Sequence, residues 1–310
     1  MQTPTTLTAP DSLENRSGRL FDETFLRKLD RLSILSRRMM AGQLQGERRS
    51  PKRGQSVEFA DFRPYTLGDD IRRIDWNAYA RLERFFIKLF VEEEDLTVHL
   101  LIDASQSMKW GSPDKFTYAV RSAGALGYIA LTGLDRVTVT ALGGGNGGSE
   151  GYLSPRRGKN QALNLFTFLQ NLRPIGRTDL GPRLRNYAAG SHPAGPLVLF
   201  SDLLDDGWQD GLRILANRGY EVTVLHVLSP DEMNPQLTGD LKLVDLETGA
   251  EVEITADYDL LQRYRTGLES WQREIANFCG ARGMHYVPLV TSITLDDLLF
   301  ALLRRRGVLR

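Results

Sequence analysis

After residue 95, short apolar runs alternate with amphipathic stretches along the chain. A buried parallel strand reads as a continuous apolar run, whereas a surface helix repeats its apolar positions every three or four residues. By these criteria the sequence predicts strands at 96–102, 136–142, 151–154, 196–201, 221–228 and 284–288. It predicts helices at 114–133, 159–171, 179–189, 206–218, 257–279 and 295–305. A hairpin is expected over 239–254, turning at Glu247-Thr248-Gly249. The alternation is typical of an α/β, doubly wound, mostly parallel sheet flanked by helices.

The N-terminal third follows a different pattern. Residues 1–18 are rich in Thr, Pro, Ser and Asn and show no period, so we expect a disordered leader. Apolar residues recur at helical spacing from Phe21 to Met40, and a basic loop follows at 46–54. That loop either contacts a phosphate or an acidic partner, or pairs with the acidic residues that follow it. We therefore expect a leader over 1–18, a small helix-plus-extended module over 19–94 and the α/β domain over 95–310.

Composition limits the classes of function. The 310 residues contain 39 Lys and Arg and 39 Asp and Glu, whereas a nucleic-acid-binding protein usually has a basic excess. Nucleic acid is therefore not an expected partner. Cys279 is the only cysteine, which excludes an intramolecular disulfide. Because we find neither a signal-peptide pattern nor an apolar run long enough to cross a bilayer, we expect a cytoplasmic protein without a membrane span.

The candidate chemistry lies at predicted strand ends and in one loop. The run 98–102 ends in Asp103, and two hydroxyls follow at alternate positions, Ser105 and Ser107. Thr178 lies between two predicted helices, and Asp202 ends the run 196–201. Open α/β sheets place ligands at the carboxyl ends of their strands, and these oxygen donors suit a magnesium-sized cation. The alternative is that Asp103 caps a helix and the serines are incidental.

These residues, in the order Asp-x-Ser-x-Ser, then Thr, then Asp, resemble the metal-ion-dependent adhesion site of the von Willebrand factor A fold. The resemblance implies that Mg²⁺, or Mn²⁺ or Ca²⁺, is bound by five residues: Asp103, Ser105, Ser107, Thr178 and Asp202. It also implies a protein partner that offers an acidic side chain to the metal. Without a metal, the two carboxylates are expected to repel each other.

A second block, from Ser56 to Trp76 and on through Phe86–Phe90 to Glu94, alternates charged and aromatic residues. It resembles a bacterial and archaeal family, domain of unknown function 58, in which such a block is fused to a von Willebrand A domain. Many members begin with two membrane helices, a pattern we do not find here. The resemblance implies an adaptor or co-chaperone that works with a MoxR-type AAA+ ATPase.

The alternative function is a divalent-metal-dependent hydrolase acting on phosphate esters. Such chemistry needs a general base near the metal. The four histidines are scattered, and His99 and His226 lie within predicted strands, where a hydrogen-bonded core histidine is expected. We find no nucleophile motif, so no catalytic or cofactor-binding residue is assigned and an enzyme is not expected.

Overall fold

The computed structural model forms two compact units, which are described separately. One comprises Met1–Gly42 and Leu96–Arg310, and the other comprises Gln43–Asp95. The structure describes residues 5–6, 20–21, 25, 27, 29–30, 58–66, 69, 71–91, 96–143, 151–177, 179–245 and 247–304.

The larger unit is built on a six-stranded sheet with the order β11-β8-β7-β4-β5-β6. Its strands are β4 (Thr97–Asp103), β5 (Arg136–Leu142), β6 (Tyr152–Arg157), β7 (Pro196–Ser201), β8 (Glu221–Leu228) and β11 (His285–Val290). All neighbours pair in parallel except β6, which is antiparallel to β5 at one edge. The prediction of a doubly wound, mostly parallel α/β sheet is confirmed.

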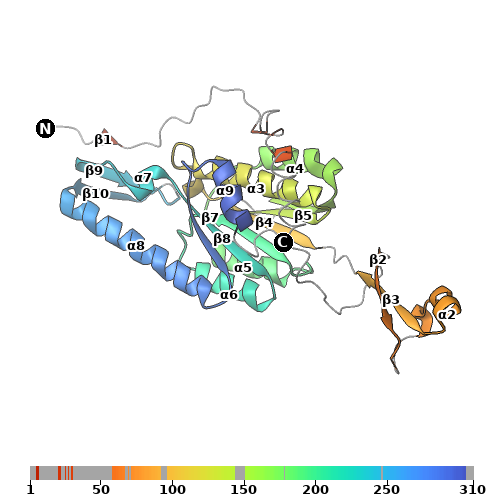
Figure 1. Cartoon of the computed structure of the whole chain (residues 1–310). Helices are drawn as coiled ribbons and strands as arrows, with labels where there is room; N and C mark the ends of the chain where they lie inside the picture. Colours follow the sequence, from red (N-terminus) through yellow and green to blue (C-terminus); the bar gives the residue numbers. More distant parts are fainter. Residues whose placement is uncertain are drawn as a thin grey trace. The chain divides into compact units, whose positions relative to one another are not determined.

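Helices cover both faces of this sheet (Figure 1). The apolar side chains of α3 (Lys115–Thr132), α4 (Ala162–Asn171) and α9 (Leu295–Arg304) form one core with the strands. Those of α5 (Leu180–Ala189), α6 (Trp208–Asn217) and α8 (Tyr258–Gly280) form a second core on the opposite face. Because successive strand residues point to opposite faces, Leu100 of β4 joins the first core and Leu101 the second.

Shorter elements extend this framework. They are η2 (Gln106–Lys109), η4 (Lys159–Gln161) and α7 (Pro230–Met233). The predicted hairpin is present as β9 (Gly239–Val244) and β10 (Glu251–Ala256), which pair antiparallel. The short strand β1 (Thr5–Thr6) pairs in parallel with β9.

The described residues of the N-terminal segment pack on the larger unit. Phe21, Phe25 and Leu29 are buried in the first core, and the Phe21 ring stacks on Phe166 of α4 with 4.6 Å between centroids. The module expected over 19–94 is thus divided, because these apolar side chains find their partners on the α/β unit. Apart from these residues and Thr5–Thr6, the expected leader and helix lie outside the described residues.

The smaller unit contains β2 (Glu58–Pro64), η1 (Ile71–Arg73), α2 (Trp76–Leu82) and β3 (Phe86–Val91). The two strands form an antiparallel pair. The Asp75 carboxylate accepts hydrogen bonds from two N–H groups at the start of α2, and Asp69 forms a two-pronged pair with Arg63 at 2.7 Å. These two acids therefore have local structural roles. The basic loop 46–54 lies outside the described residues.

The topology fixes where a ligand site can lie. From β4 the chain continues to β5 on one side of the sheet, whereas from β7 it continues to β8 on the other. The direction of winding reverses between β4 and β7, which pair with each other. Such a switch point leaves an opening at the carboxyl ends of the two strands.

The contact between α5 and α6 gives a test of the fold. A Cβ atom added at Gly181 would lie 2.7 Å from the Gly207 carbonyl oxygen, a contact that only a backbone shift can relieve. We expect Gly181→Ala to lower the free energy of unfolding by about 1–3 kcal/mol, measured by urea denaturation. Gly267→Ala on α8 is the control, because nothing lies within 4 Å of its added Cβ. It should raise stability by about 0.5–1 kcal/mol through helix propensity, and equal effects of the two variants would contradict the proposed packing.

Candidate functional site

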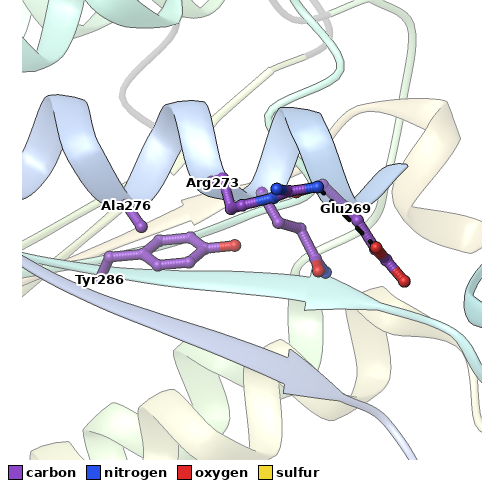
Figure 2. A pocket seen from close by; sticks show the side chains of 5 residues that line it. Glu269, Arg273, Ala276 and Tyr286 are labelled. Carbon is purple, nitrogen blue, oxygen red and sulfur yellow. Dashed lines mark hydrogen bonds and ion pairs between the residues drawn. The ribbon is translucent and has the colours of Figure 1, made fainter. Parts of the chain in front are cut away.

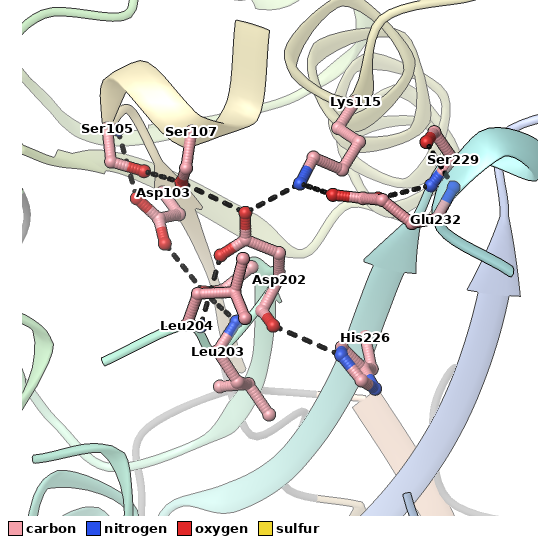
Figure 3. Close-up of polar contacts among 11 residues, drawn as sticks. Asp103, Ser105, Ser107, Lys115, Asp202, Leu203, Leu204, His226, Ser229 and Glu232 are labelled. Carbon is pink, nitrogen blue, oxygen red and sulfur yellow. Dashed lines mark hydrogen bonds and ion pairs between the residues drawn. The ribbon is translucent and has the colours of Figure 1, made fainter. Parts of the chain in front are cut away.

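Two carboxylates meet at the switch point of the sheet (Figure 3). Asp103 is the last residue of β4, and Asp202 directly follows β7. Both side chains belong to buried residues, with 3% and 1% of their surface exposed. Ser105 and Ser107 lie just beyond Asp103, at the start of η2 and within it. The structure therefore brings together four of the five residues that the sequence singled out.

Asp103 is held by hydrogen bonds from two directions. One oxygen, Oδ1, accepts the N–H of Ser105 at 3.0 Å, and Oδ2 accepts the hydroxyl of Ser201 at 2.6 Å. The Ser201 hydroxyl in turn accepts the N–H of Leu203 at 2.9 Å. The carboxylate thus links the loop after β4 to the loop after β7. The alternative, that Asp103 is only a helix cap, does not account for the Ser201 bond.

The serines connect Asp103 to Asp202. The hydroxyl oxygens of Ser105 and Ser107 are 2.9 Å apart, and the Ser107 hydroxyl donates to Asp202 Oδ2 at 2.9 Å. The other oxygen of Asp202 accepts the N–H of Leu204 at 3.2 Å. Carboxylate and hydroxyl oxygens therefore converge from two strand ends.

The predicted fifth ligand, Thr178, lies outside the described residues. The residues that precede Thr178, however, are hydrogen-bonded to the segment that carries Ser105 and Ser107. Gln106 N–H donates to the Gly176 carbonyl at 2.9 Å, and Ile175 N–H donates to the Ala104 carbonyl at 2.8 Å.

A buried lysine completes the polar cluster. Lys115 opens α3 and has 0% of its surface exposed. Its Nζ lies 2.7 Å from Asp202 Oδ2 and 2.6 Å from Glu232 Oε1, and Figure 3 shows it between the two carboxylates. Burial alone lowers the pKa of Lys115, but attraction to Asp202 and Glu232 outweighs it, and the net pKa is raised. Lys115 is therefore a resident ammonium ion at the edge of the site.

Lys115 and Glu232 were not predicted as site residues, although each stands in a sequence pattern that could have indicated a role. A cation in the first turn of a helix opposes the helix dipole, so a lysine there needs specific anionic partners. Glu232 closes a Ser-x-x-Glu capping box at the start of α7, in which its Oε2 accepts the N–H of Ser229 at 2.7 Å. The capping box fixes the glutamate that holds the lysine.

The cluster carries more negative than positive charge. Three carboxylates, of Asp103, Asp202 and Glu232, face one ammonium ion, a formal charge of minus two. Burial, followed by repulsion from Asp202, raises the pKa of Asp103 to about 6, although hydrogen bonds from Ser201 and Ser105 oppose the shift. The excess charge and the hard-oxygen donors fit a divalent cation. Within the described residues, no three His, Cys, Asp or Glu side chains group as a metal site, so the hydroxyl donors are essential to this fit.

The histidine beside the site is committed to structural hydrogen bonds. His226 is buried, and its Nε2 lies 3.1 Å from the backbone carbonyl oxygen of Asp202. A carbonyl only accepts, so this nitrogen carries the proton, and Nδ1 accepts from the Tyr286 hydroxyl at 2.8 Å. Burial lowers the pKa of His226 to about 4. His99 is also buried between a tyrosine hydroxyl and a backbone carbonyl, so both predictions of hydrogen-bonded core histidines are confirmed.

An open hollow of about 320 Å³ lies between α8 and β11 (Figure 2). Tyr286 lines it together with Glu269 and Arg273, which pair with each other at 3.9 Å. Tyr286 is hydrogen-bonded to His226, and His226 is hydrogen-bonded to the backbone carbonyl of Asp202, so Tyr286 helps to position that backbone. The hollow itself presents no buried charge.

The sequence comparison identifies the family. A family model described as protein of unknown function DUF58 matches residues 61–274. Since the match covers more than half of the chain, the protein belongs to this family, and the resemblance of its second block is confirmed.

Relatives and solved structures extend the comparison. The uncharacterized proteins Rv1480 of Mycobacterium tuberculosis and Mb1516 of Mycobacterium bovis are each 26% identical over 306 residues, covering 94% of this chain and 93% of the relative. BatB from Bacteroides thetaiotaomicron, a conserved hypothetical protein, is 15% identical with a TM-score of 0.41, covering 67% of this chain and 96% of BatB. A von Willebrand factor type A structure from Catenulispora acidiphila is 14% identical with a TM-score of 0.32, covering 46% and 35%. These overlaps are partial, and the fold assignment is based on the sheet topology.

In the part of the chain that the structure describes, no helix combines the length and apolar composition needed to cross a bilayer.

The buried ion pair predicts a large effect of removing the lysine. In Lys115→Met, Asp202 and Glu232 lose their common cation while staying buried or partly buried. We expect the free energy of unfolding in chelator to fall by about 3–5 kcal/mol in urea denaturation. Lys109→Met, at an exposed position of η2, is the matched control and should change it by less than about 0.5 kcal/mol. A loss below about 1 kcal/mol for Lys115→Met would contradict the ion-pair arrangement.

The raised pKa of Asp103 predicts a pH dependence of stability. Because the fold favours the neutral carboxyl, Asp103 destabilises the protein progressively as pH rises from its unfolded value of 3.8 to about 6. Above pH 6 the cost is complete, about 3 kcal/mol. Metal-free Asp103→Asn should therefore match wild type at pH 4 and exceed it in free energy of unfolding at pH 8. Equal stability of the two proteins at both pH values would contradict the raised pKa of Asp103.

Proposed function

We propose that the protein is a metal-dependent protein-interaction module whose site lies at the switch point between β4 and β7. The observation that supports this proposal is the convergence of Asp103 and Asp202 with two serine hydroxyls in a cluster that keeps excess negative charge. Asp103, Ser105, Ser107 and Asp202 would hold the ion, with Thr178 as the fifth predicted ligand. Mg²⁺ is proposed first, with Mn²⁺ and Ca²⁺ as alternatives.

The donor set favours binding over hydrolysis. Two carboxylates and neutral hydroxyls leave a divalent cation with little surplus negative charge around it, and magnesium keeps several exchangeable positions. When bound, the cation would have an open coordination position that an acidic side chain of another protein could fill. The family resemblance adds a MoxR-type AAA+ ATPase as the first partner to test, with this chain as its adaptor or co-chaperone.

We propose no catalytic role for this site. His226, the histidine beside Asp202, uses one ring nitrogen on the Asp202 carbonyl and the other on Tyr286, and neither points to the carboxylates. Lys115 is held between two carboxylates with a raised pKa, so it stays charged and does not act as a base at neutral pH.

The proposal predicts one divalent-cation site that depends on Asp103. Calorimetric titration with Mn²⁺ should show one bound ion for wild type and at least a tenfold loss of affinity for Asp103→Ala. Asp206→Ala is the matched control, because it removes an exposed carboxylate close in sequence to Asp202. A purified MoxR-type AAA+ ATPase should then bind the wild-type protein in Mg²⁺, and the complex should dissociate when chelator is added.

Three results would count against the proposal. Equal Mn²⁺ affinity of wild type and Asp103→Ala would remove the site. Partner binding that survives both chelator and Asp103→Ala would move the interface elsewhere. Metal-dependent hydrolysis of a phosphate ester that Asp103→Ala abolishes would replace the interaction module with the alternative, an enzyme.

A further inference from the structure

The block of charged and aromatic residues in the smaller unit has no role in the proposed metal site, yet its helix α2 carries an exposed apolar face. Trp76, Tyr79 and Leu82 follow one another at intervals of three residues, which places them on the same side of α2. Their exposed fractions are 61%, 38% and 60%, and α2 buries none of its residues. An amphipathic helix normally turns its apolar stripe toward a core. Among the described residues, no segment covers this stripe.

Phe85 extends the apolar stripe into a continuous patch. Its ring, 43% exposed, stacks on the Tyr79 ring with 4.4 Å between centroids. The Trp76 ring meets both of these rings edge-on, with its centroid 6.3 Å from each. We call the four residues Trp76, Tyr79, Leu82 and Phe85 the α2 face. Single exposed apolar residues are ordinary on a protein surface, whereas a contiguous patch marks an interaction site.

The backbone beneath the α2 face is held in place by hydrogen bonds. The buried Asp75 accepts the N–H groups of Asn77 and Ala78 at 2.8 and 3.1 Å, and its own N–H donates to the Phe86 carbonyl at 2.9 Å. A helix of seven residues is not stable by itself, so these bonds maintain α2 without burial of its apolar side chains. The rings are therefore presented on a fixed backbone, which lowers the entropic cost of binding.

The charges beside the α2 face are mainly positive. Arg81 lies on α2, and Arg84 directly precedes Phe85. Both arginines are exposed, and no ion pair or hydrogen bond joins either guanidinium to another described residue. Glu83 is the one acidic residue between Trp76 and Phe85 in the sequence. Trp, Tyr and Arg are the side chains that contribute most to binding in protein interfaces, and this arrangement fits a partner surface of negative charge.

We propose that the α2 face is a second interaction surface, which binds an acidic amphipathic segment of a partner protein. Apolar side chains of the segment cover the exposed rings, and its carboxylates pair with Arg81 and Arg84. The proposal goes beyond the metal-dependent function, because it uses no metal and no residue of the cluster between β4 and β7. A protein is favoured over a nucleic acid, since residues 43–95 contain ten Lys and Arg and eleven Asp and Glu, without the basic excess that a phosphate backbone requires.

The test uses the full chain in chelator, so that the candidate metal site makes no contribution. The probe is a labelled synthetic peptide of about 15 residues with Leu and Phe at the i, i+3, i+4 and i+7 positions of a helix and Glu elsewhere. One matched peptide replaces every Glu with Lys, and another replaces every Leu and Phe with Ser. In fluorescence anisotropy titrations the acidic amphipathic peptide should bind wild type at least about tenfold more tightly than either matched peptide.

Variants assign the binding to the α2 face. We expect Trp76→Ala, and separately the double variant Arg81→Glu with Arg84→Glu, to weaken binding of the acidic peptide at least about tenfold. Tyr258→Ala, which removes a ring that is 74% exposed on α8, and Arg185→Glu at an exposed position of α5 are the matched controls. Both controls should bind like wild type, and circular dichroism checks that every variant is folded.

Several outcomes would overturn the proposal. The α2 face is excluded if wild type does not bind the acidic peptide, or if Trp76→Ala and the double arginine variant bind it as wild type does. A single-stranded oligonucleotide that displaces the peptide would identify a nucleic acid as the occupant instead. Self-association in sedimentation that Trp76→Ala abolishes would identify a second copy of the chain. Because Mn²⁺ binding is measured separately, failure of the metal site leaves the α2 face unaffected, and failure of the α2 face leaves the metal site unaffected.

Discussion

The organisation of the site depends on one electrostatic constraint: carboxylates are buried together where the sheet changes its direction of winding. Lys115 partly neutralises these carboxylates through its ion pairs with Asp202 and Glu232. The two ion pairs join three segments that are distant in sequence: the start of α3, the end of β7 and the capping box of α7. Removing ions from water is expensive, and a buried pair repays that cost only with good geometry. The short contacts of Lys115 meet that condition, while Asp103 is left to hydrogen bonds from Ser201 and Ser105.

Much of the fold follows from the pattern of apolar residues. The strands β5, β7 and β8 begin and end at the predicted residues. The clearest case is β7, which is buried along its whole length and is a nearly continuous apolar run, so its limits are sharp. The proximity of Asp103 to Asp202 also follows, since neighbouring parallel strands bring their carboxyl ends to one edge. The short helix α7 was missed because four residues are too few to show a period.

The rest of the site could not be predicted, because it depends on contacts between distant segments. Lys115 and Glu232, which form an ion pair, are 117 residues apart in the chain. No local period records such contacts. For the same reason the sequence assigned residues 19–42 to the N-terminal module, whereas Phe21 stacks on Phe166 of the α/β unit.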